Sequence, residues 1–194
     1  IGLKFLNLPT GIINKTQNKE CVCINIVGEN HDAIKAGTLL NIEDSIYSFL
    51  PKGHETFSAH HMGASYLSKH TSYKTTDIET FVNARIHALN REYGIISFSD
   101  TNQRKTPFTQ EEIIFVQLLA SKVGHLINHK EALQNANKRR HHYQEIFYKS
   151  PVMMCTVDNK GKLLDVNNEW LSALEYGDEV VTGKDLDSFV YKDS

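Results

Sequence analysis

The feature that most constrains this chain is a stretch without glycine or proline, from residue 125 to residue 150. Because these two residues are the ones that interrupt helices, a stretch that lacks both favours a long helix. The helix is expected to begin earlier, where Thr109 and Glu112 have capping-box spacing, and to end before Ser150-Pro151. We therefore expect a helix of about 35 residues, longer than most helices of globular proteins.

Apolar residues along this predicted helix recur at intervals of three, four and seven, which is heptad spacing. The apolar positions of this seam are Val116, Leu119, Val123, Leu126 and Leu133. Its polar positions are Lys130, Asn137, Arg140 and Gln144. The second half of the seam is therefore a weak coiled coil, and we expect residues 109–148 to pair with a second copy as a homodimer.

The sequence before this helix predicts a sheet, because apolar residues alternate between turn signals. Residues 1–8 have the pattern of a short helix, which Pro9 and Gly11 end. Strands are expected over residues 11–15, 20–27, 38–42, 55–59, 80–89 and 92–98, with a short helix over 46–50. A histidine-rich loop of about twenty residues, 60–79, separates two of the strands, and such a length indicates function. Asn90-Arg91 is the expected hairpin turn.

After Pro151 the pattern returns to strands, over residues 153–158 and 162–166, and a helix follows from Asn167 through Leu174. Two strands do not make a stable sheet by themselves. We expect this second unit to be incomplete.

Composition excludes several classes of function. The chain has 21 Lys and Arg against 23 Asp and Glu, a net charge of −2, whereas non-specific nucleic-acid binding needs many cationic contacts to phosphate. We expect no nucleic-acid partner. The longest apolar-dominated stretch, 113–120, is far shorter than a membrane-spanning helix. Three cysteines favour a reducing compartment, so a cytoplasmic location without membrane contact is expected. Because the first residue is Ile1, the chain is interpreted as a piece of a longer protein, whose membrane tether, if any, lies elsewhere.

The segment 81–98 contains Glu92-Tyr-Gly-Ile-Ile-Ser-Phe98, and Phe108-Thr-Gln-Glu-Glu112 follows it. The first motif is similar to the hairpin of a GAF domain and the second to the start of that family's last helix, so residues 1–130 resemble this family. Ile42-Glu-Asp-Ser-Ile-Tyr47 resembles its short helix beside the ligand pocket. Asn90 and Arg85 depart from the family pattern, which has a turn glycine and commonly a proline at these positions. The resemblance implies an α+β fold, an antiparallel sheet flanked by helices.

Residues 149–194 contain the motifs Val157-Asp158-x-x-Gly161 and Leu163-x-x-Val-Asn-x-x-Trp-Leu171. With these motifs the segment resembles the first half of a PAS domain. The two resemblances imply a GAF-like sensory domain over residues 1–128, a helical linker over 129–148 and a truncated PAS-like α/β unit over 149–194. Such an order is similar to bacterial multidomain signalling proteins. Two-component histidine kinases and diguanylate cyclases of cyclic di-GMP signalling are examples.

The GAF resemblance implies a small-molecule pocket between the sheet and the segments 44–49 and 60–79. Aromatic surfaces with a few polar groups are what such a pocket requires. The ligand-binding candidates are Ser45, Ser48, Phe49, Phe57, His60, Tyr66, Tyr73, Phe81 and Arg85. Arg85 is suited either to an acidic ligand or to the outer face of the sheet. The ligand is unknown, and because neither Cys21 nor Cys23 matches the attachment pattern of phytochrome GAF domains, no bilin attachment is expected.

Other chemistry has little support in the sequence. His60 and His61 are adjacent on a strand and point to opposite faces, while His125 and His129 lack the glutamate of a metalloprotease motif. We expect no metal site and no catalytic residue, and buried structural thiols at Cys21 and Cys23. The predicted function is a sensory and dimerisation module that regulates an output domain outside this chain. The alternative is a ligand-free scaffold that only dimerises.

Overall fold

The computed structural model describes residues 1–18, 20–28, 35–51, 53–176 and 181–189. The chain forms two compact units, Ile1–Lys130 and Glu131–Ser194. The strands of the first unit are β1 (Thr10–Gln17), β2 (Glu20–Gly28), β3 (Leu39–Asn41), β4 (Thr56–Ala59), β5 (Thr80–Ala88) and β6 (Arg91–Asp100). Its helices are α1 (Gly2–Leu6), α2 (Thr71–Thr76) and the first part of α3 (Gln110–Lys149), with 3₁₀ turns η1 (Ile42–Asp44), η2 (Ile46–Phe49) and η3 (Tyr66–Lys69).

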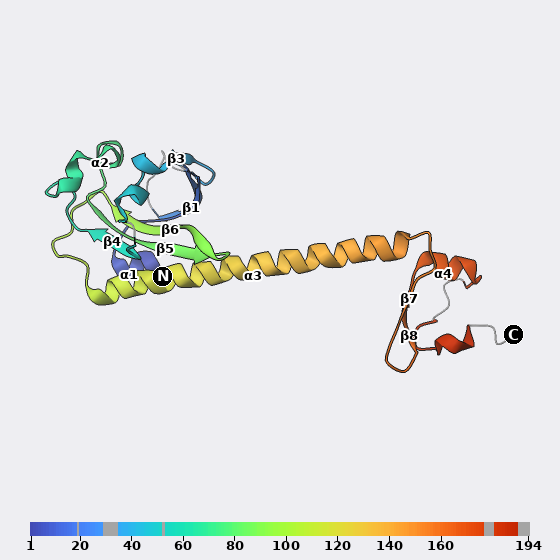
Figure 1. Ribbon diagram of the computed structural model, residues 1–194. Helices are drawn as coiled ribbons and strands as arrows, with labels where there is room; N and C mark the ends of the chain where they lie inside the picture. Colours follow the sequence, from blue (N-terminus) through green and yellow to red (C-terminus); the bar gives the residue numbers. More distant parts are fainter. Residues whose placement is uncertain (19, 29–34, 52, 177–180, 190–194) are drawn as a thin grey trace. The chain divides into compact units, whose positions relative to one another are not determined.

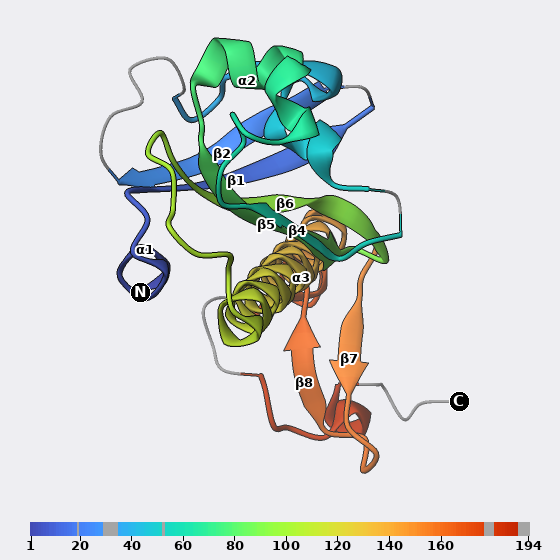
Figure 2. The ribbon, with the colours of Figure 1, turned by 90° about the vertical axis from the view of Figure 1, so that its left-hand side faces the viewer.

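The six strands form one antiparallel sheet in the order β3-β2-β1-β6-β5-β4. Every strand expected from the sequence is present, and no strand end differs from its expected position by more than two residues. The central strands β1, β6 and β5 are long and buried because layers of helix cover both of their faces. Figure 2 shows α1 and α3 on one side of the sheet, and α2 with the short 3₁₀ turns on the other. We call these the helix face and the cap face.

The helix face holds the larger apolar core. Val82, Ala84 and Ile86 of β5 are buried there with Val116 and Ala120 of α3. Further members of this core are Leu6, Leu8, Ile96, Phe98 and Phe108. Burial of such side chains is worth roughly 1.5–3 kcal/mol each, so α3 is an integral layer of the first unit.

The helix α3 spans 40 residues and so exceeds the expected length. Figure 1 shows it as one continuous helix. Its capping box is confirmed: Glu112 N donates to Thr109 Oγ1 at 3.3 Å, and Thr109 N donates to Glu112 Oε2 at 2.8 Å. Arg104 Nη2 lies 2.6 Å from Glu112 Oε1 and fixes the same carboxylate. The helix ends at Lys149, next to Ser150-Pro151, as the sequence predicts.

The expected heptad seam is divided between two roles. Val116 is buried against the sheet, and Leu119 and Val123 pack on the same core, so these positions are not open to a second copy. Leu126 and Leu133 are about half exposed, at 56% and 54%. The expectation of one continuous pairing seam is therefore wrong for its first half, because the sheet already covers that side of α3.

Two local details of the first unit differ from expectation. The central residues of the β5–β6 turn are Leu89 and Asn90, not Asn90 and Arg91, and both have positive φ, 56° and 57°. The segment 60–79 is not an irregular loop, since it contains η3 and α2. Ser65 starts η3 by accepting a hydrogen bond from Leu67 N at 3.2 Å.

The second unit contains a two-stranded antiparallel sheet and short helices. Its elements are β7 (Cys155–Val157), β8 (Leu163–Val166), α4 (Asn168–Ala173) and η4 (Leu186–Ser188). Trp170 is buried with Leu163, Val166 and Val181 in a small core. Asn167 caps α4 by accepting from Trp170 N at 2.9 Å. The two expected strands and the helix after them are confirmed, while the PAS-like identity of this unit stays a prediction.

Candidate ligand-binding site

The cap face of the sheet carries a cluster of aromatic side chains at the place that the sequence indicates. The ring centroids of Phe49 and Phe81 lie 5.5 Å apart, and those of Phe57 and Phe81 lie 5.9 Å apart. Met62 and Leu67 complete this second buried cluster with Ile78. Strand β5 brings Phe81 to it, while η2 and β4 bring the other two rings. Three predicted site residues therefore meet around one point of the cap face.

The serines of the cap have mainly local partners. Ser45 accepts from Tyr47 N at 3.3 Å and so begins η2. Ser48 Oγ donates to Ser45 O at 2.7 Å and lies 3.2 Å from His70 Nε2. Ser45 and Ser65 thus stand at the starts of two similar 3₁₀ turns. Their side chains stabilise the shape of the cap.

Arg85 lies at the cap face, but all its donors are engaged. An arginine has five N–H donors, and Arg85 has five partners within reach. These are His54 O at 2.8 Å, Tyr47 Oη at 3.3 Å, Leu50 O at 3.3 Å, Pro51 O at 3.0 Å and Glu92 Oε2 at 2.6 Å. Its side chain is 9% exposed. The guanidinium therefore ties the segment after η2 to the sheet, and a ligand would have to displace one of these partners.

Tyr73 and Glu79 close the segment 60–79 into a loop. Tyr73 Oη donates to Glu79 Oε1 at 2.5 Å, and Gly63 N donates to Glu79 Oε2 at 3.0 Å. Burial acts to raise the pKa of Glu79, but these hydrogen bonds and the nearby His61 outweigh it, so the pKa lies below its ordinary value. The hydrogen bond to the carboxylate raises the pKa of Tyr73. We call the contacts of Tyr73, Gly63 and Glu79 the loop latch.

The two remaining candidates differ in position. Tyr66 is 78% exposed, so its ring is not part of the aromatic cluster. His60 is partly buried, and its carbonyl oxygen accepts from Thr80 Oγ1 at 3.0 Å and from Arg104 N at 2.8 Å. The backbone of His60 therefore has a structural role. The assignment of the whole set as ligand-binding residues stays a prediction.

Sequence reasoning missed three polar residues of the cap face. Asn14, Asn83 and Ser97 are buried, and each has a side-chain atom with no hydrogen-bond partner in the described part of the chain. The signal that could have found them is a polar residue at an inward position of an apolar strand, as in Phe81-Val-Asn83. A buried polar atom without a partner is uncommon and calls for an explanation.

The cysteines of β2 also lie on this side of the molecule. Cys21 and Cys23 are buried and not disulfide-bonded. Burial raises the pKa of both thiols, and a thiol with a raised pKa is a weak nucleophile at neutral pH. The expected burial of both thiols is confirmed. In the described residues no group of three or more His, Cys, Asp or Glu side chains is placed to hold a metal ion.

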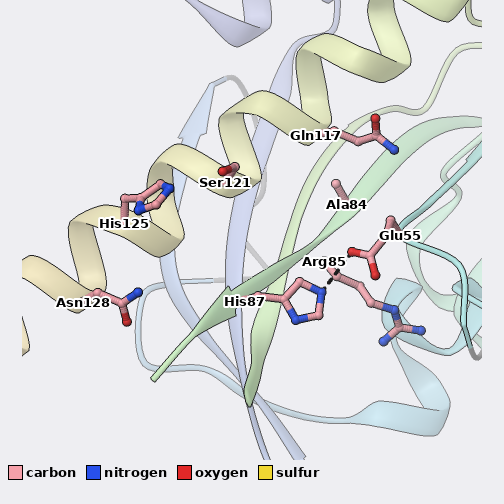
Figure 3. Close-up of a pocket in the computed structure, with 8 residues that line it drawn as sticks. All are labelled: Glu55, Ala84, Arg85, His87, Gln117, Ser121, His125 and Asn128. Atoms are coloured by element: carbon pink, nitrogen blue, oxygen red, sulfur yellow. Dashed lines mark hydrogen bonds and ion pairs between the residues drawn. The ribbon is translucent and has the colours of Figure 1, made fainter. Parts of the chain in front are cut away.

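A cleft lies on the helix face, between β5 and α3 (Figure 3). It is a cleft of about 350 Å³. Its lining residues are Glu55, Ala84, Arg85, His87, Gln117, Ser121, His125 and Asn128. His87 Nε2 lies 2.9 Å from Glu55 Oε2, but both side chains are more than half exposed. Such a surface pair contributes little to stability.

Asn128, at the end of this cleft, joins α3 to the β5–β6 hairpin. Its Oδ1 accepts from Leu89 N at 2.8 Å. The hairpin turn and the helix thus hold each other in place. A shift of β5 or β6 would therefore displace α3, both through this hydrogen bond and through the apolar core beside it.

Comparison with solved structures identifies the architecture. The GAF domain of PixJ from Thermosynechococcus elongatus, in its blue-light absorbing form, has a TM-score of 0.59 at 9% identity, and the match covers 73% of this chain and 87% of that one. The fold is that of a GAF domain. A phycocyanobilin-bound GAF domain from a cyanobacterial phytochrome has a TM-score of 0.54 at 13% identity, over 66% of this chain and 78% of that one.

A third GAF-like match is a domain of a protein described as a two-component sensor histidine kinase, from Sinorhizobium meliloti 1021. Its TM-score is 0.53 at 13% identity, and the match covers 70% of this chain and 90% of that one. No protein-family model and no curated protein matches the sequence. No helix in the described residues is long and apolar enough to cross a membrane.

Proposed function

We propose that this chain is a sensory and regulatory module of a signal-transduction protein. The cap face of its GAF-fold unit would take a small molecule, and α3 would carry the response to the second unit and onward to an output domain such as a histidine kinase or diguanylate cyclase. The observation that carries this proposal is the double role of α3. Val116 and Ala120 of this helix are buried against the sheet, while the same helix continues without interruption to Lys149.

A shift of the sheet would be transmitted through this helix because packed cores do not deform continuously. The contact of Asn128 with Leu89 N adds a polar connection between the hairpin and α3. In the solved structures with this fold, one GAF domain holds phycocyanobilin and another belongs to a protein described as a sensor kinase. These two examples are consistent with the proposal.

The proposal includes homodimerisation through the second half of α3. Every residue from 131 to 146 is exposed, and an unsupported helix of this length is only marginally stable in water. Leu133 is among these residues and lies on the seam, at 54% exposed. A second copy of the helix would cover it.

The alternative, a ligand-free dimerisation scaffold, has one specific observation in its favour. The ring of Phe81 contacts those of Phe49 and Phe57 on the cap face, and Phe81 and Phe49 are already buried, at 0% and 6% exposed. In the scaffold model the cluster is simply a second core. No catalytic role is proposed for this chain in either model.

Native mass spectrometry of the freshly purified chain, compared with the denatured chain, tests the sensor model. We expect an additional mass that is lost on denaturation. The adduct should be absent from Phe81→Ala and retained in the control Tyr66→Ala, whose side chain is 78% exposed. Folding of Phe81→Ala must be checked by circular dichroism. A bare chain that dimerises normally would favour the scaffold model.

A further inference from the structure

Three buried polar atoms on the cap face point to the kind of molecule that binds there. Asn14 Oδ1, Asn83 Nδ2 and Ser97 Oγ have no hydrogen-bond partner among the described residues. The three residues are 8%, 0% and 3% exposed. Most buried polar groups in folded proteins are paired, and leaving one unpaired costs about 1–3 kcal/mol. Three such atoms on adjacent strands therefore need a common explanation.

The register of the sheet places the three residues on the same face. Ser97 of β6 is paired with Asn83 of β5 on one side and with Ile12 of β1 on the other. Asn14 follows Ile12 by two residues, and alternate residues of a strand share a face. The intervening Val82 and Ile96 are buried in the core of the opposite, helix face. All three orphan atoms thus belong to residues of the cap face.

Aromatic rings border this polar group. Phe57 is paired with Asn83 in the β4–β5 register, and its backbone N donates to Asn83 Oδ1 at 3.2 Å. Phe81 lies two residues before Asn83 and is fully buried. The amide of Asn83 keeps its orientation through the bond from Phe57, which leaves Nδ2 as a donor. The cap face therefore offers apolar ring surfaces next to an amide donor, a hydroxyl and an amide oxygen acceptor.

The surrounding strand segments offer no free positive charge, so they do not favour an anionic ligand. Residues 10–14, 80–85 and 95–99 contain one charged residue, Arg85. Its guanidinium is already paired with Glu92 at 2.6 Å and with backbone carbonyl groups. A carboxylate or phosphate placed here would lose its hydration without gaining a free cation, which is costly.

We propose that the cap face binds a small uncharged molecule that has a planar apolar ring and an amide-like group. The carbonyl of this group would accept from Asn83 Nδ2 and Ser97 Oγ, and its N–H would donate to Asn14 Oδ1. The inference rests on the proposed sensory function and names the ligand class of that site. Because the three atoms are buried, the ligand reaches them only when part of the layer on the cap face moves away from the sheet.

Benzamide and benzoate are the probes that test this proposal. They share a ring and nearly the same shape, but benzoate is an anion. The full chain, labelled with ¹⁵N, is titrated with each probe, and the side-chain amide signals of Asn83 and Asn14 are followed by NMR. We expect saturable shifts of these signals with benzamide, and a dissociation constant at least about tenfold larger for benzoate, which corresponds to about 1.4 kcal/mol.

Two variants form a matched pair for the same titration. Ser97→Ala removes an orphan hydroxyl, and we expect it to weaken benzamide binding several-fold while leaving the fold intact. Thr80→Val removes a hydroxyl that is equally buried but has partners, His60 O at 3.0 Å and Asn102 O at 2.8 Å. This control should leave benzamide binding unchanged, even though it lowers the melting temperature.

The outcomes separate the ligand class from the sensory function. Equal or tighter binding of benzoate, with shifts at Asn83, would overturn the ligand class but leave a binding site on the cap face. Shifts from neither probe at these residues would also overturn the proposal. The sensory function itself would then still be decided by the adduct in native mass spectrometry.

Discussion

At the turn between β5 and β6, two consecutive residues adopt the left-handed backbone conformation. Asn90 tolerates this conformation well, whereas Leu89 does not, because its Cβ crowds the backbone. The strain at Leu89 is accepted in a hairpin whose turn must have positive φ at both central residues. Asn128 supports the turn by binding Leu89 N.

Leu89→Asn should stabilise the first unit by about 0.5–1 kcal/mol, because asparagine adopts the left-handed region at lower cost. Leu89 is 39% exposed, so little apolar contact is lost. Urea denaturation at equilibrium measures the change. Asn90→Leu is the reverse control and should lower the free energy of unfolding. A destabilised Leu89→Asn would show that the leucine side chain has a packing role outweighing the strain.

The loop latch makes stability depend on pH. The pKa of Glu79 is lower in the folded chain than its ordinary value of about 4.3. A lowered pKa means that the ionised carboxylate stabilises the fold above about pH 4.3, and that this contribution is lost as the pH falls through the folded-state pKa. Protonation would weaken its hydrogen bonds from Tyr73 and Gly63.

Glu79→Gln should therefore be less stable than the parent chain at pH 7, and the difference should shrink as the pH falls below about 4. Urea denaturation at several pH values checks this. Glu55→Gln is the control, since that carboxylate is 58% exposed in a surface pair and should matter little at any pH. A Glu79→Gln deficit that stays constant from pH 7 to pH 3.5 would contradict the role given to the charge.

At the scale of elements, α3 is one helix whose two parts have different surroundings. Its first part is a layer of the GAF fold, since Val116 and Ala120 are buried on the sheet. In its second part, every residue from 131 to 146 is exposed. Heptad spacing runs through both parts, but the sheet covers the seam in the first part, at Val116, Leu119 and Val123. The dimer interface that we propose is accordingly confined to Leu126 and the residues after it.

Leu133→Glu should dissociate the proposed homodimer, because it places a charge on the pairing seam. We expect the dimer dissociation constant to rise at least about tenfold, measured by size-exclusion chromatography with light scattering. Leu118→Glu is the matched control: Leu118 is 64% exposed on the same helix but lies off the seam. If the parent chain is monomeric at high concentration, or if Leu118→Glu dissociates it equally, the seam is not the interface.

At the scale of the whole molecule, each unit has its own core. The first unit has the buried clusters of both sheet faces, and the second has a small cluster around Trp170. The residues 131–140, which lie between these cores along the chain, are all exposed. The stability of each unit should therefore be independent of the helical segment 131–140.

Ala136→Pro should interrupt α3 without unfolding the first unit. Proline removes a helical hydrogen bond and costs about 3 kcal/mol in a helix interior. Hydrogen exchange followed by mass spectrometry should show faster exchange near residue 136 and unchanged slow exchange in β5 and β6. Ala136→Gln, which keeps the helix, is the control. Loss of protection throughout the sheet would show that the two units fold as one.

Much of the fold was contained in the sequence, because its signals are local. The capping box at Thr109 and Glu112, the stop at Pro151 and the alternation of the strands each act within a few residues of the chain. Such signals predicted the strands and the long helix correctly. The resemblance of their segments to a GAF domain also predicts that Phe49, Phe57 and Phe81 lie together.

What only the tertiary structure decided depends on contacts between distant segments. The role of Arg85 follows from carbonyl groups more than thirty residues away, and the first half of the heptad seam is covered by a sheet built earlier in the chain. The unpaired atoms of Asn14, Asn83 and Ser97 become visible only when three strands are aligned. Periodicity determines which side of an element is apolar, but the physical environment of that side depends on what the rest of the chain packs against it.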